Sequence, residues 1–404
     1  MRHIIQVLAA AALVGLVSFV FLLRPGPPQV TAPLTAAETE HPAVITLAAV
    51  GDLLMHMPVV NAARDGQSGT YDFSAIFAPV RPYISFPDFA IANLETRLAG
   101  AARGYCGYPL FNTPAQLAYD LRKAGVDLVA TANNHSLDMG WDGIVQTLDN
   151  LDAAGVAHVG TYRNATEKAT PFIADVHGVR VAILNYTAST NGLPVPPGKD
   201  FAVNILDPQV VVAEARAARR MDADLVVAIL HFGNEYQRWP TQEQRQLARE
   251  LCAGGVDVII GSHPHVVQPI ERLTVMRNGK TYGCVVAYSL GNFISNQRWR
   301  YSDSGIVLYL RIEKDHHGTR IRSVEYLPVW VQKKAVAGRW IYRVLPVTPD
   351  IPAAATSLTD PERQRMAEVW EELTTHLNNP AQGIFPYVAA VSTEPQGARS
   401  PGKP

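Results

Sequence analysis

The chain has 404 residues, of which 48% are hydrophobic, so it carries enough apolar surface to build one large domain or two ordinary ones. Its 35 basic and 36 acidic side chains give a formal net charge of -1. This balance excludes a whole-chain field that would attract nucleic acid, and the composition excludes an intrinsically disordered protein.

The N-terminal segment is apolar. Residues 4–23 carry no charge, and their number matches the roughly 20 residues that span the hydrocarbon core of a bilayer. Residues 1–24 are therefore predicted to form a transmembrane helix that stays in place as a single-pass cell-membrane anchor, with a cleaved signal peptide as the alternative. Residues 25–42, rich in proline and alanine, are predicted to be a linker. Such an anchor leaves the following domain outside the cytoplasm, in the periplasm or at the cell surface.

Residues 43–350 alternate between strand and helix patterns, which is typical of an α/β fold. Short apolar runs have the length and continuity of strands buried on both faces. These runs lie at residues 44–50, 89–94, 126–132, 181–185, 224–230, 256–260 and 285–289. Helix patterns lie between them, at residues 113–124, 141–154, 208–221 and 241–253.

Capping residues mark the ends of two predicted helices. Thr113 and Pro114 are predicted to open the first helix as N-cap and first-turn proline. Thr241 and Gln244 are predicted to form a capping box at the start of another. Cys252 lies in that helix and is predicted, like Cys284, to fill the core. Three cysteines in the whole chain exclude a zinc–thiolate cluster and allow at most one internal disulfide.

One internal similarity links two helix–strand units. GVDLVATANNH and GVDVIIGSHPH share a glycine that ends a helix, a Val-Asp pair and an apolar strand, and each has a histidine ten residues after the glycine. The two units are therefore expected to deliver His135 and His265 at equivalent places, although Gly-Val-Asp is also a common way to enter a strand.

The last third of the chain is predicted to contribute packing and a tail. Residues 351–388 are predicted to be a helical extension that packs on the domain, and residues 389–404 a disordered tail. Trp299, Trp330 and Trp340 are predicted to be packing residues, with glycan stacking as the alternative.

Polar residues follow the predicted strands, each at a carboxyl end. In open α/β sheets ligands bind outside the carboxyl ends of the strands, so residues far apart in the sequence are expected to converge on one site. The residues are Asp52 and His56 after the first strand, Glu95 after the second, Asn134, His135 and Asp138 after the third, His231 after the fifth, and His263 and His265 after the sixth. A single histidine at a strand end is usually structural, but the whole set indicates a shared ligand.

The composition of this set favours a divalent metal. Neutral imidazole and carboxylate ligands suit Zn, Mn or Fe better than calcium. Such residues hold one ion, or two ions about 3.5 to 4 Å apart that clamp a phosphoryl group while an activated water attacks. Pro264 is expected to fix a turn that aims His263 and His265 at one cluster, because in an extended strand they would point to opposite faces.

Six ordered motifs resemble those of the CapA family of bacterial capsule and poly-gamma-glutamate synthesis proteins, a branch of the calcineurin-like metallophosphoesterase fold. The motifs are GDLLMH, NLETRL, ANNHSLDMGWDG, LHFGNEY, GSHPHVVQ and YSLGNF, and the resemblance covers residues 44–312. It implies a four-layer metallophosphatase-like α/β/β/α sandwich with a metal site at one edge.

The resemblance also implies roles for single residues. Asp52 corresponds to the first metal-binding aspartate, Asn134 to an asparagine ligand, and His135 to the catalytic histidine that protonates a leaving group. The later metal-binding histidines correspond to His231, His263 and His265. The implied cofactor is a divalent transition metal, Mn, Fe or Zn, as one or two ions.

The sequence departs from the metallophosphoesterase pattern at two positions. The first motif of that fold reads Asp-x-His, whereas Leu54 stands at the place of its histidine here, and His56 is the nearest replacement, as a metal ligand or as a substrate-facing group. No aspartate matches the bridging residue of the second motif, so Glu95 is the candidate. Asp138 is predicted to orient the His135 imidazole, or else to start a turn.

Two functions are consistent with these features. The first is a membrane-anchored extracytoplasmic metallohydrolase that acts on a phosphoester, or on an ester or amide of a surface polymer, with metal-activated water attack and His135 as general acid. The second is a non-catalytic, metal-containing accessory subunit that binds or exports a polyanionic surface polymer. The fold does not decide between them. The expected partners are that polymer or phosphoester, the membrane, and other membrane proteins of capsule synthesis.

Overall fold

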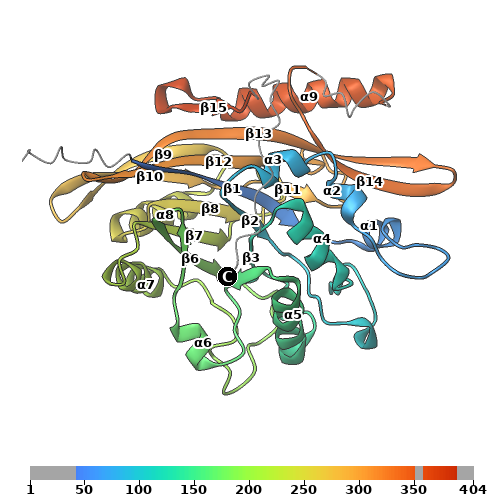
Figure 1. Cartoon of the computed structure of the whole chain (residues 1–404), viewed down its shortest axis with the longest axis horizontal. Coiled ribbons are helices and arrows are strands. Elements are labelled where there is room, and N and C mark those ends of the chain that lie inside the picture. The colour runs from blue at the N-terminus through green and yellow to red at the C-terminus, as the bar shows by residue number, and fades with distance from the viewer. Residues whose placement is uncertain (1–41, 351–357, 389–404) are drawn as a thin grey trace, which may run out of the picture. The chain divides into compact units, whose positions relative to one another are not determined.

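The computed structural model describes residues 42–350 and 358–388 (Figure 1). The predicted membrane anchor, nearly all of the linker and the predicted tail lie outside these ranges. Within them, no helix has both the length and the apolar character that crossing a bilayer requires. The α/β class predicted from the alternating pattern is confirmed, because strands and helices alternate along the described chain.

The first sheet has the strand order β14-β13-β12-β1-β2-β3-β4, with β11 beside β1 and β15 beside β13. Strands β1 to β4 are parallel to one another, whereas β12, β13 and β14 are antiparallel. The strands are β1 (Ala43–Leu53), β2 (Phe89–Asn93), β3 (Leu128–Ala130), β4 (Ala157–Val159), β11 (Asn292–Ile294), β12 (Ser304–Asp315), β13 (Gly318–Val336), β14 (Arg339–Pro346) and β15 (Ile384–Pro386).

The second sheet has the strand order β5-β6-β7-β8-β10-β9. Strands β6, β7, β8 and β10 are parallel, and the two edge strands are antiparallel to their neighbours. The strands are β5 (Phe172–Val176), β6 (Val179–Thr187), β7 (Leu225–His231), β8 (Val258–Ser262), β9 (Ile270–Arg277) and β10 (Lys280–Ala287).

Helices cover the outer faces of both sheets (Figure 1). The apolar stripes of α4 and α5 pack on the first sheet, and those of α7 and α8 pack on the second. The helices are α1 (Met57–Ala62), α2 (Ser74–Phe77), α3 (Arg81–Ser85), α4 (Gln116–Ala124), α5 (Gly140–Ala154), α6 (Ala165–Ala169), α7 (Pro208–Arg220), α8 (Gln242–Gly254) and α9 (Asp360–Leu377).

A third apolar core lies between the two sheets. Leu47 of β1 and Leu308 of β12 meet Val227 of β7 and Val258 of β8 in one buried cluster. Each such side chain contributes about 1.5 to 3 kcal/mol to folding when it is fully buried. Together the three cores fix the order helix, sheet, sheet, helix. Helix α9 packs through Val369 and its neighbours on the β13 side of the first sheet (Figure 1).

An aspartate at the entrance of a parallel strand ties that strand to the next one. The Asp127 carboxylate accepts the N–H of Ala90 at 2.9 Å, and the Asp257 carboxylate accepts the N–H of Val226 at 2.8 Å. The equivalent bonds elsewhere join Asp88 to Thr46 and Asp224 to Arg180. The Gly-Val-Asp similarity in the sequence therefore corresponds to a shared hydrogen-bonding pattern, and each of the two strands leads to a histidine at its far end.

Of the two predicted helix starts, one is confirmed and one is wrong. Thr241 and Gln244 form the capping box at the start of α8. Helix α4, in contrast, begins at Gln116, with Ala115 in the N-cap position. The prediction failed because the Thr113 hydroxyl pairs with a second buried hydroxyl at 2.8 Å, and so it is not available to cap the helix.

The two cysteines expected to be simple core residues are joined to each other. Cys252 in α8 and Cys284 in β10 are both buried, as predicted, but they form a disulfide. The core-filling interpretation was incomplete because α8 and β10 are neighbours only in the folded chain, and their spacing of 32 residues gives no signal of it.

Two of the three tryptophans predicted to pack in the core are exposed. Trp330 is buried, whereas Trp299 and Trp340 are 66% and 52% exposed. Trp340 lies on β14, close to the turn that joins it to β13, and Lys333 lies over its ring at 4.6 Å. The prediction was wrong for Trp299 and Trp340 because the β13–β14 hairpin and the segment after β11 carry them at the surface.

Candidate metal centre

The carboxyl ends of strands from both sheets meet at one edge and bring the predicted residues together. From the first sheet, β1 delivers Asp52 and the segment after β3 delivers Asn134, while β7 and β8 of the second sheet deliver His231 and His265. The His265 Nδ1 atom lies 3.0 Å from Asp52 Oδ2, and the His231 Nε2 atom lies 2.9 Å from Asn134 Oδ1. All four side chains are buried.

Two overlapping groups of side chains have metal-ligand spacing. One group contains Asp52, Glu95 and His265, and the other contains Glu95, His231 and His263. Within each group the potential ligand atoms lie within 4.8 Å of one another. Glu95 belongs to both groups, so it occupies the place that the bridging residue of a two-ion site would take.

The surroundings of Glu95 fit a cation. This carboxylate is fully buried, and neither of its oxygens has a hydrogen-bond partner among the described residues. The nearest nitrogens are those of His231, at 3.4 Å, and His265, at 3.8 Å. A buried carboxylate without donors is strongly unfavourable. Imidazole and carboxylate groups around it are the ligands of a divalent transition metal, which would supply the missing partner.

Electrostatics separate the two carboxyl groups of the centre. Burial, together with the charge of Asp52, raises the pKa of Glu95 to about 8. Burial would also raise the pKa of Asp52, but the hydrogen bond from His265, with the charges of His265 and His231, holds that pKa below its ordinary value. Asp52 is thus ionised in the metal-free protein, whereas Glu95 holds a proton that an ion would displace.

The pKa values of the three histidines of the centre are shifted in different directions. Burial lowers the pKa of His231 and that of His263 to about 3, so both imidazoles are neutral and have a free lone pair at neutral pH. Burial opposes protonation of His265 as well, but the charge of Glu95 and the hydrogen bond to Asp52 raise its pKa to about 9. Two neutral nitrogens are therefore available as ligands before any ion arrives.

The His-Pro-His turn has the irregular backbone that the sequence predicted. His263 and His265 have φ values of 97° and 58°, in the left-handed region that residues other than glycine seldom adopt. The chain is held there by the Tyr236 N–H, which donates to the Pro264 carbonyl at 2.8 Å. Such a conformation costs on the order of 1 to 3 kcal/mol per residue, and it aims both rings at the same cluster.

His135 and Asp138 form a second unit beside the two groups. The His135 Nδ1 atom lies 2.7 Å from Asp138 Oδ2, which also accepts the N–H of Phe111 at 2.7 Å. The Phe111 ring meets the His135 imidazole edge to face at 4.6 Å. Asp138 therefore orients the imidazole, the first of the two roles weighed for it.

His56 lies outside both metal-ligand groups. Its Nδ1 atom is 3.3 Å from the Leu54 carbonyl oxygen and 3.4 Å from the Asn296 nitrogen, and its ring meets Phe111 edge to face at 5.3 Å. Burial lowers its pKa to about 4. This placement beside the ring that packs on His135 suits the substrate-facing alternative.

Two residues of the NLETRL motif take part in the centre without having been singled out. Asn93 donates to Asp52 Oδ1 at 2.8 Å and so fixes that carboxylate. Arg97 is fully buried and donates to the carbonyl oxygens of Leu94 and Thr131. Burial lowers the pKa of Arg97 to about 10, against the opposing charges of nearby carboxylates. The position of Arg97 shortly after an apolar strand could have singled it out in the sequence.

Comparison with known sequences places the chain among capsule proteins. Residues 46–297 match the profile of the bacterial capsule synthesis protein PGA_cap family. The chain is 31% identical to the PGA biosynthesis protein CapA of Bacillus subtilis over 322 residues, which are 75% of this chain and 78% of that protein. The chain belongs to the PGA_cap family. The resemblance inferred from the six motifs is thereby confirmed.

Other relatives of this PGA_cap protein match over shorter stretches. The capsule biosynthesis protein CapA of Bacillus anthracis is 28% identical over 70% of this chain and 66% of its own length, slightly under two thirds. A probable polyglutamine synthesis accessory protein of Mycobacterium tuberculosis is 29% identical over 49% of this chain and 54% of its own.

Solved structures give weaker similarities. The NAD nucleotidase of Haemophilus influenzae aligns with a TM-score of 0.47 at 14% identity, over 84% of this chain and 64% of its own. The calcineurin-like phosphoesterase YfkN of Bacillus subtilis aligns with a TM-score of 0.42 at 15% identity, over 82% of this chain and 98% of its own. At such scores they say nothing about the activity of this PGA_cap protein.

Proposed function

We propose that this PGA_cap protein is a metal-dependent hydrolase that cleaves a phosphoester, or an ester or amide bond of a surface polymer of the poly-gamma-glutamate type. The observation that carries the proposal is the Glu95 carboxylate, which is buried without a hydrogen-bond donor and shared by two groups of ligands. A metal ion held by Glu95 and the histidines of these groups would supply the partner that this carboxylate lacks. The ligand types suit Mn, Fe or Zn.

The residues of the chain divide the chemistry between them. Asp52, Glu95, His231, His263 and His265 would hold the metal, which supplies Lewis acidity and lowers the pKa of water. These side chains come from rigid strand ends on two packed sheets, so they keep their geometry without rearrangement.

His135 is the proposed general acid. Its Nδ1 atom faces Asp138, so Nε2, on the other side of the ring, is left to deliver a proton to a leaving group. The buried Asp138 carboxylate fixes the orientation of the ring through its contact with Nδ1.

We also propose that the protein acts outside the cytoplasm, anchored by residues 1–24, close to membrane proteins of capsule synthesis. The Cys252–Cys284 disulfide supports this location, because disulfides persist in oxidising compartments and are rare in the cytosol. The apolar residues 4–23 support the anchor.

A non-catalytic accessory role is the second candidate. It is favoured by Leu54, a buried apolar residue at the position where an Asp-x-His motif would supply a further donor. In that case the metal centre would bind a polyanionic polymer without turnover.

Metal analysis and turnover on the purified full-length chain separate these functions. The wild type, His135→Ala, His263→Ala and the surface control His316→Ala are reloaded with Mn, Fe or Zn and tested on bis(p-nitrophenyl) phosphate and on poly-gamma-glutamate. We expect His263→Ala to lose metal and turnover, His135→Ala to keep metal but lose turnover, and His316→Ala to keep both. Metal without turnover in the wild type would favour the accessory role, and equal metal in all four proteins would contradict the centre.

A further inference from the structure

A second large cavity lies at the other end of the sheets from the metal centre. It has a volume of about 1120 Å³ and is formed by the ends of α7 and α8, the β9–β10 hairpin and the β12–β13 turn, at the left-hand end of Figure 1. Asp257, which precedes β8, lines the cavity, and His263, which follows β8, belongs to the metal centre. The five residues of β8 lie between them, so six steps of extended chain, about 20 Å, separate Asp257 from His263.

The cavity is lined by an excess of positive charge. We call it the arginine cleft, because its lining includes Arg216, Arg219, Arg272, Arg277 and Arg320. Its acidic lining residues are Asp224 and Asp257.

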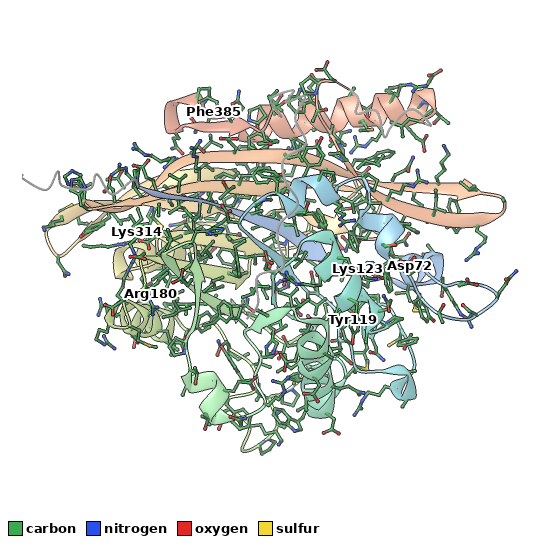
Figure 2. All side chains as sticks on the ribbon, viewed as in Figure 1. Asp72, Tyr119, Lys123, Arg180, Lys314 and Phe385 are labelled. Atoms are coloured by element: carbon green, nitrogen blue, oxygen red, sulfur yellow. A yellow bond between two sulfur atoms is a disulfide. The ribbon has the colours of Figure 1, made fainter. Side chains whose placement is uncertain are left out.

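Both aspartates of the arginine cleft are already engaged. Asp257 accepts hydrogen bonds from Arg219 and Arg277, besides the strand-entrance bond described above. Asp224 accepts a hydrogen bond from the Lys314 ammonium group at 2.7 Å and another from the backbone N–H of Arg180 at 2.8 Å. Figure 2 shows Lys314 and Arg180 at this end of the molecule. The acidic groups therefore do not neutralise the remaining arginines.

Those remaining arginines have donors to spare. Arg272 is half-buried and pairs with no carboxylate of the described chain; one of its N–H groups donates to the Ile321 carbonyl at 3.3 Å. Arg216 is exposed and forms no ion pair with the described residues. Arg320 is paired with Glu313 and, at 2.7 Å, with Asp315, and only its buried Nε has no hydrogen-bond partner in the described ranges, so Arg216 and Arg272 are the arginines of the cleft whose charge is unpaired. A buried guanidinium donor without an acceptor, such as Arg320 Nε, is unfavourable, and an anion in the cleft would supply the acceptor while it neutralises the charges of Arg216 and Arg272.

We infer that the arginine cleft is a second anion-binding site, which takes a chain bearing several carboxylates or phosphates. A guanidinium group presents paired N–H donors that match the two oxygens of either anion. The volume exceeds the roughly 300 to 1,000 Å³ typical of small-molecule pockets, so a segment of a polymer fits it better than a single ion does.

Such a site would hold one part of a polyanion while another part lies at the metal centre, about 20 Å away along β8. The choice of a surface polymer as the occupant rests on the proposed function. The affinity for oxyanions rests on the arginines alone and does not require the metal centre.

Binding measurements on the full-length chain test the inference. Polyglutamate, polyphosphate of equal charge and inorganic phosphate are titrated calorimetrically, at low and at physiological salt, into the wild type and three variants. Arg216→Gln/Arg272→Gln is expected to bind polyglutamate about tenfold more weakly, with a shallower dependence on salt. The matched control Arg81→Gln/Arg249→Gln loses the same charge elsewhere on the surface and should bind like the wild type. His263→Ala should still bind polyglutamate through the arginine cleft, although it is expected to lose turnover.

Each result bears on a separate part of the inference. Polyphosphate bound more tightly than polyglutamate would support the site and assign it phosphates. Wild-type affinity in Arg216→Gln/Arg272→Gln, equal weakening in the control pair, or loss of binding in His263→Ala would overturn it, and so would inorganic phosphate binding as tightly as the polymers. If the double variant fails to fold, Arg216→Glu on the exposed side of α7 replaces it and should weaken polyglutamate binding at least as much.

Discussion

Glu95 belongs to both groups of possible metal ligands, although it lies two residues beyond the end of β2. The strand end itself is occupied by Asn93, which donates to Asp52 at 2.8 Å. Glu95 therefore starts two residues further along the chain, and its longer side chain brings its oxygens to within 3.4 Å of His231 and 3.8 Å of His265. The neutral amide of Asn93 therefore occupies the strand end, and the Glu95 carboxylate reaches the metal centre from the segment that follows.

Glu95→Gln should affect both groups of ligands at once. We expect it to lose bound metal at least as completely as His263→Ala does, since Glu95 belongs to both groups of ligands and His263 to only one. Without metal, however, the variant should be at least as stable as the wild type, because it removes a buried ionisable group. Metal content by mass spectrometry and denaturant midpoints in chelator check the two effects. A Glu95→Gln protein that retains wild-type metal content would contradict the shared position of this residue.

Asp138→Asn tests the positioning of His135. Replacing the carboxylate with a carboxamide weakens the acceptor for Nδ1, so the imidazole ring is no longer held in one orientation and tautomer. We expect kcat to fall by about 10²-fold or more, with KM and metal content unchanged. A fall in kcat with stability and metal content retained would not follow from a merely structural defect. Loss of metal in this variant would instead place Asp138 among the groups that support the ligands.

At the residue scale the sequence predicted the types of residue but not all of their partners. Strand-end positions and the family motifs were enough to single out Asp52, Glu95 and the histidines. Asn93 and Arg97 were missed because their roles depend on hydrogen bonds between neighbouring strands and loops. Such pairs leave no spacing signal in the chain, since Asn93 and Asp52 are 41 residues apart.

At the element scale, the end of β1 depends on a close approach between two backbones. A Cβ atom on Gly51 would lie 1.9 Å from the Gly291 carbonyl oxygen, and the same oxygen accepts the Asp52 N–H at 2.9 Å. Only glycine allows β1 to lie this close to the turn before β11. The position of Asp52 is therefore set by an element that comes some 240 residues later in the sequence.

Gly51→Ala should consequently disturb both folding and the metal centre. We expect the free energy of unfolding to fall by about 1 to 3 kcal/mol and the metal affinity to drop, because the backbone that carries Asp52 must move. Denaturant titration in chelator and metal titration measure the two effects. Gly66→Ala is the control, since a Cβ there meets nothing within 4 Å. Unchanged stability and affinity in Gly51→Ala would show that β1 tolerates the displacement.

The disulfide gives a second prediction at this scale. Joining Cys252 to Cys284 closes a loop of 32 residues between α8 and β10, for which chain entropy suggests about 3 to 4 kcal/mol of stabilisation. Cys252→Ala/Cys284→Ala should therefore lower the denaturant midpoint substantially, whereas Cys106→Ala, outside the disulfide, should change it little. Reducing agent should destabilise the wild type but not the double variant. Equal midpoints with and without reductant would show that the bond adds nothing to stability.

Local patterns predicted most elements because the physics of those elements is local. Apolar runs, and glycines at the ends of helices, identified the strands and helices around the centre. The Gly-Val-Asp pattern identified two strands that Asp127 and Asp257 join to their neighbours by hydrogen bonds. The failures concern long-range pairing. The Thr113 hydroxyl forms a hydrogen bond with a residue of another segment instead of capping the helix. Cys252 can form its disulfide with Cys284 only because α8 packs on the second sheet.

At the scale of the whole molecule, the parallel strands give the domain two chemically different ends. Carboxyl ends gather imidazoles, carboxylates and a carboxamide in the metal centre, whereas the amino ends of β7 and β8 open on the arginine cleft. The metal centre could be predicted because its residues follow strands in recognisable motifs. The arginine cleft could not, since its arginines come from α7, β9 and β13 without a shared pattern.

The distribution of buried histidines predicts how the stability of the metal-free protein depends on pH. Five imidazoles of the described chain have a folded-state pKa below the unfolded value of 6.5: His56 and His376 at about 4, His231 and His263 at about 3, and His158, whose pKa burial also lowers. Between these values and pH 6.5 the unfolded chain binds more protons than the folded one. Stability therefore rises with pH through this window and is lost as the pH falls toward 4.

Two groups with a raised pKa make the stability of the metal-free protein fall as the pH rises. The pKa of Glu95 is raised to about 8 and that of His265 to about 9, so the folded state holds these protons where the unfolded chain has released them. The contribution of His265 to the free energy of unfolding is fully present below pH 6.5 and is lost as the pH rises through 9. Glu95 destabilises the folded state by an amount that grows between pH 4.5 and pH 8. The metal-free protein should therefore be most stable at about pH 6 to 7.

Metal should move this optimum upward, because an ion binds neutral imidazoles and an ionised Glu95 and so competes with the protons that they hold. Urea midpoints from pH 4.5 to 9, with chelator and with Mn or Zn, measure both curves, and the gain on adding metal should be larger at pH 8 than at pH 6. His376→Gln, which removes a half-buried histidine of α9 that belongs to neither ligand group, should reduce proton uptake on unfolding near pH 5.5 by up to about one proton, without changing the response to metal. A gain from metal that is the same at pH 6 and pH 8 would show that the ion displaces no proton from Glu95, and the shared position of this carboxylate would have to be abandoned.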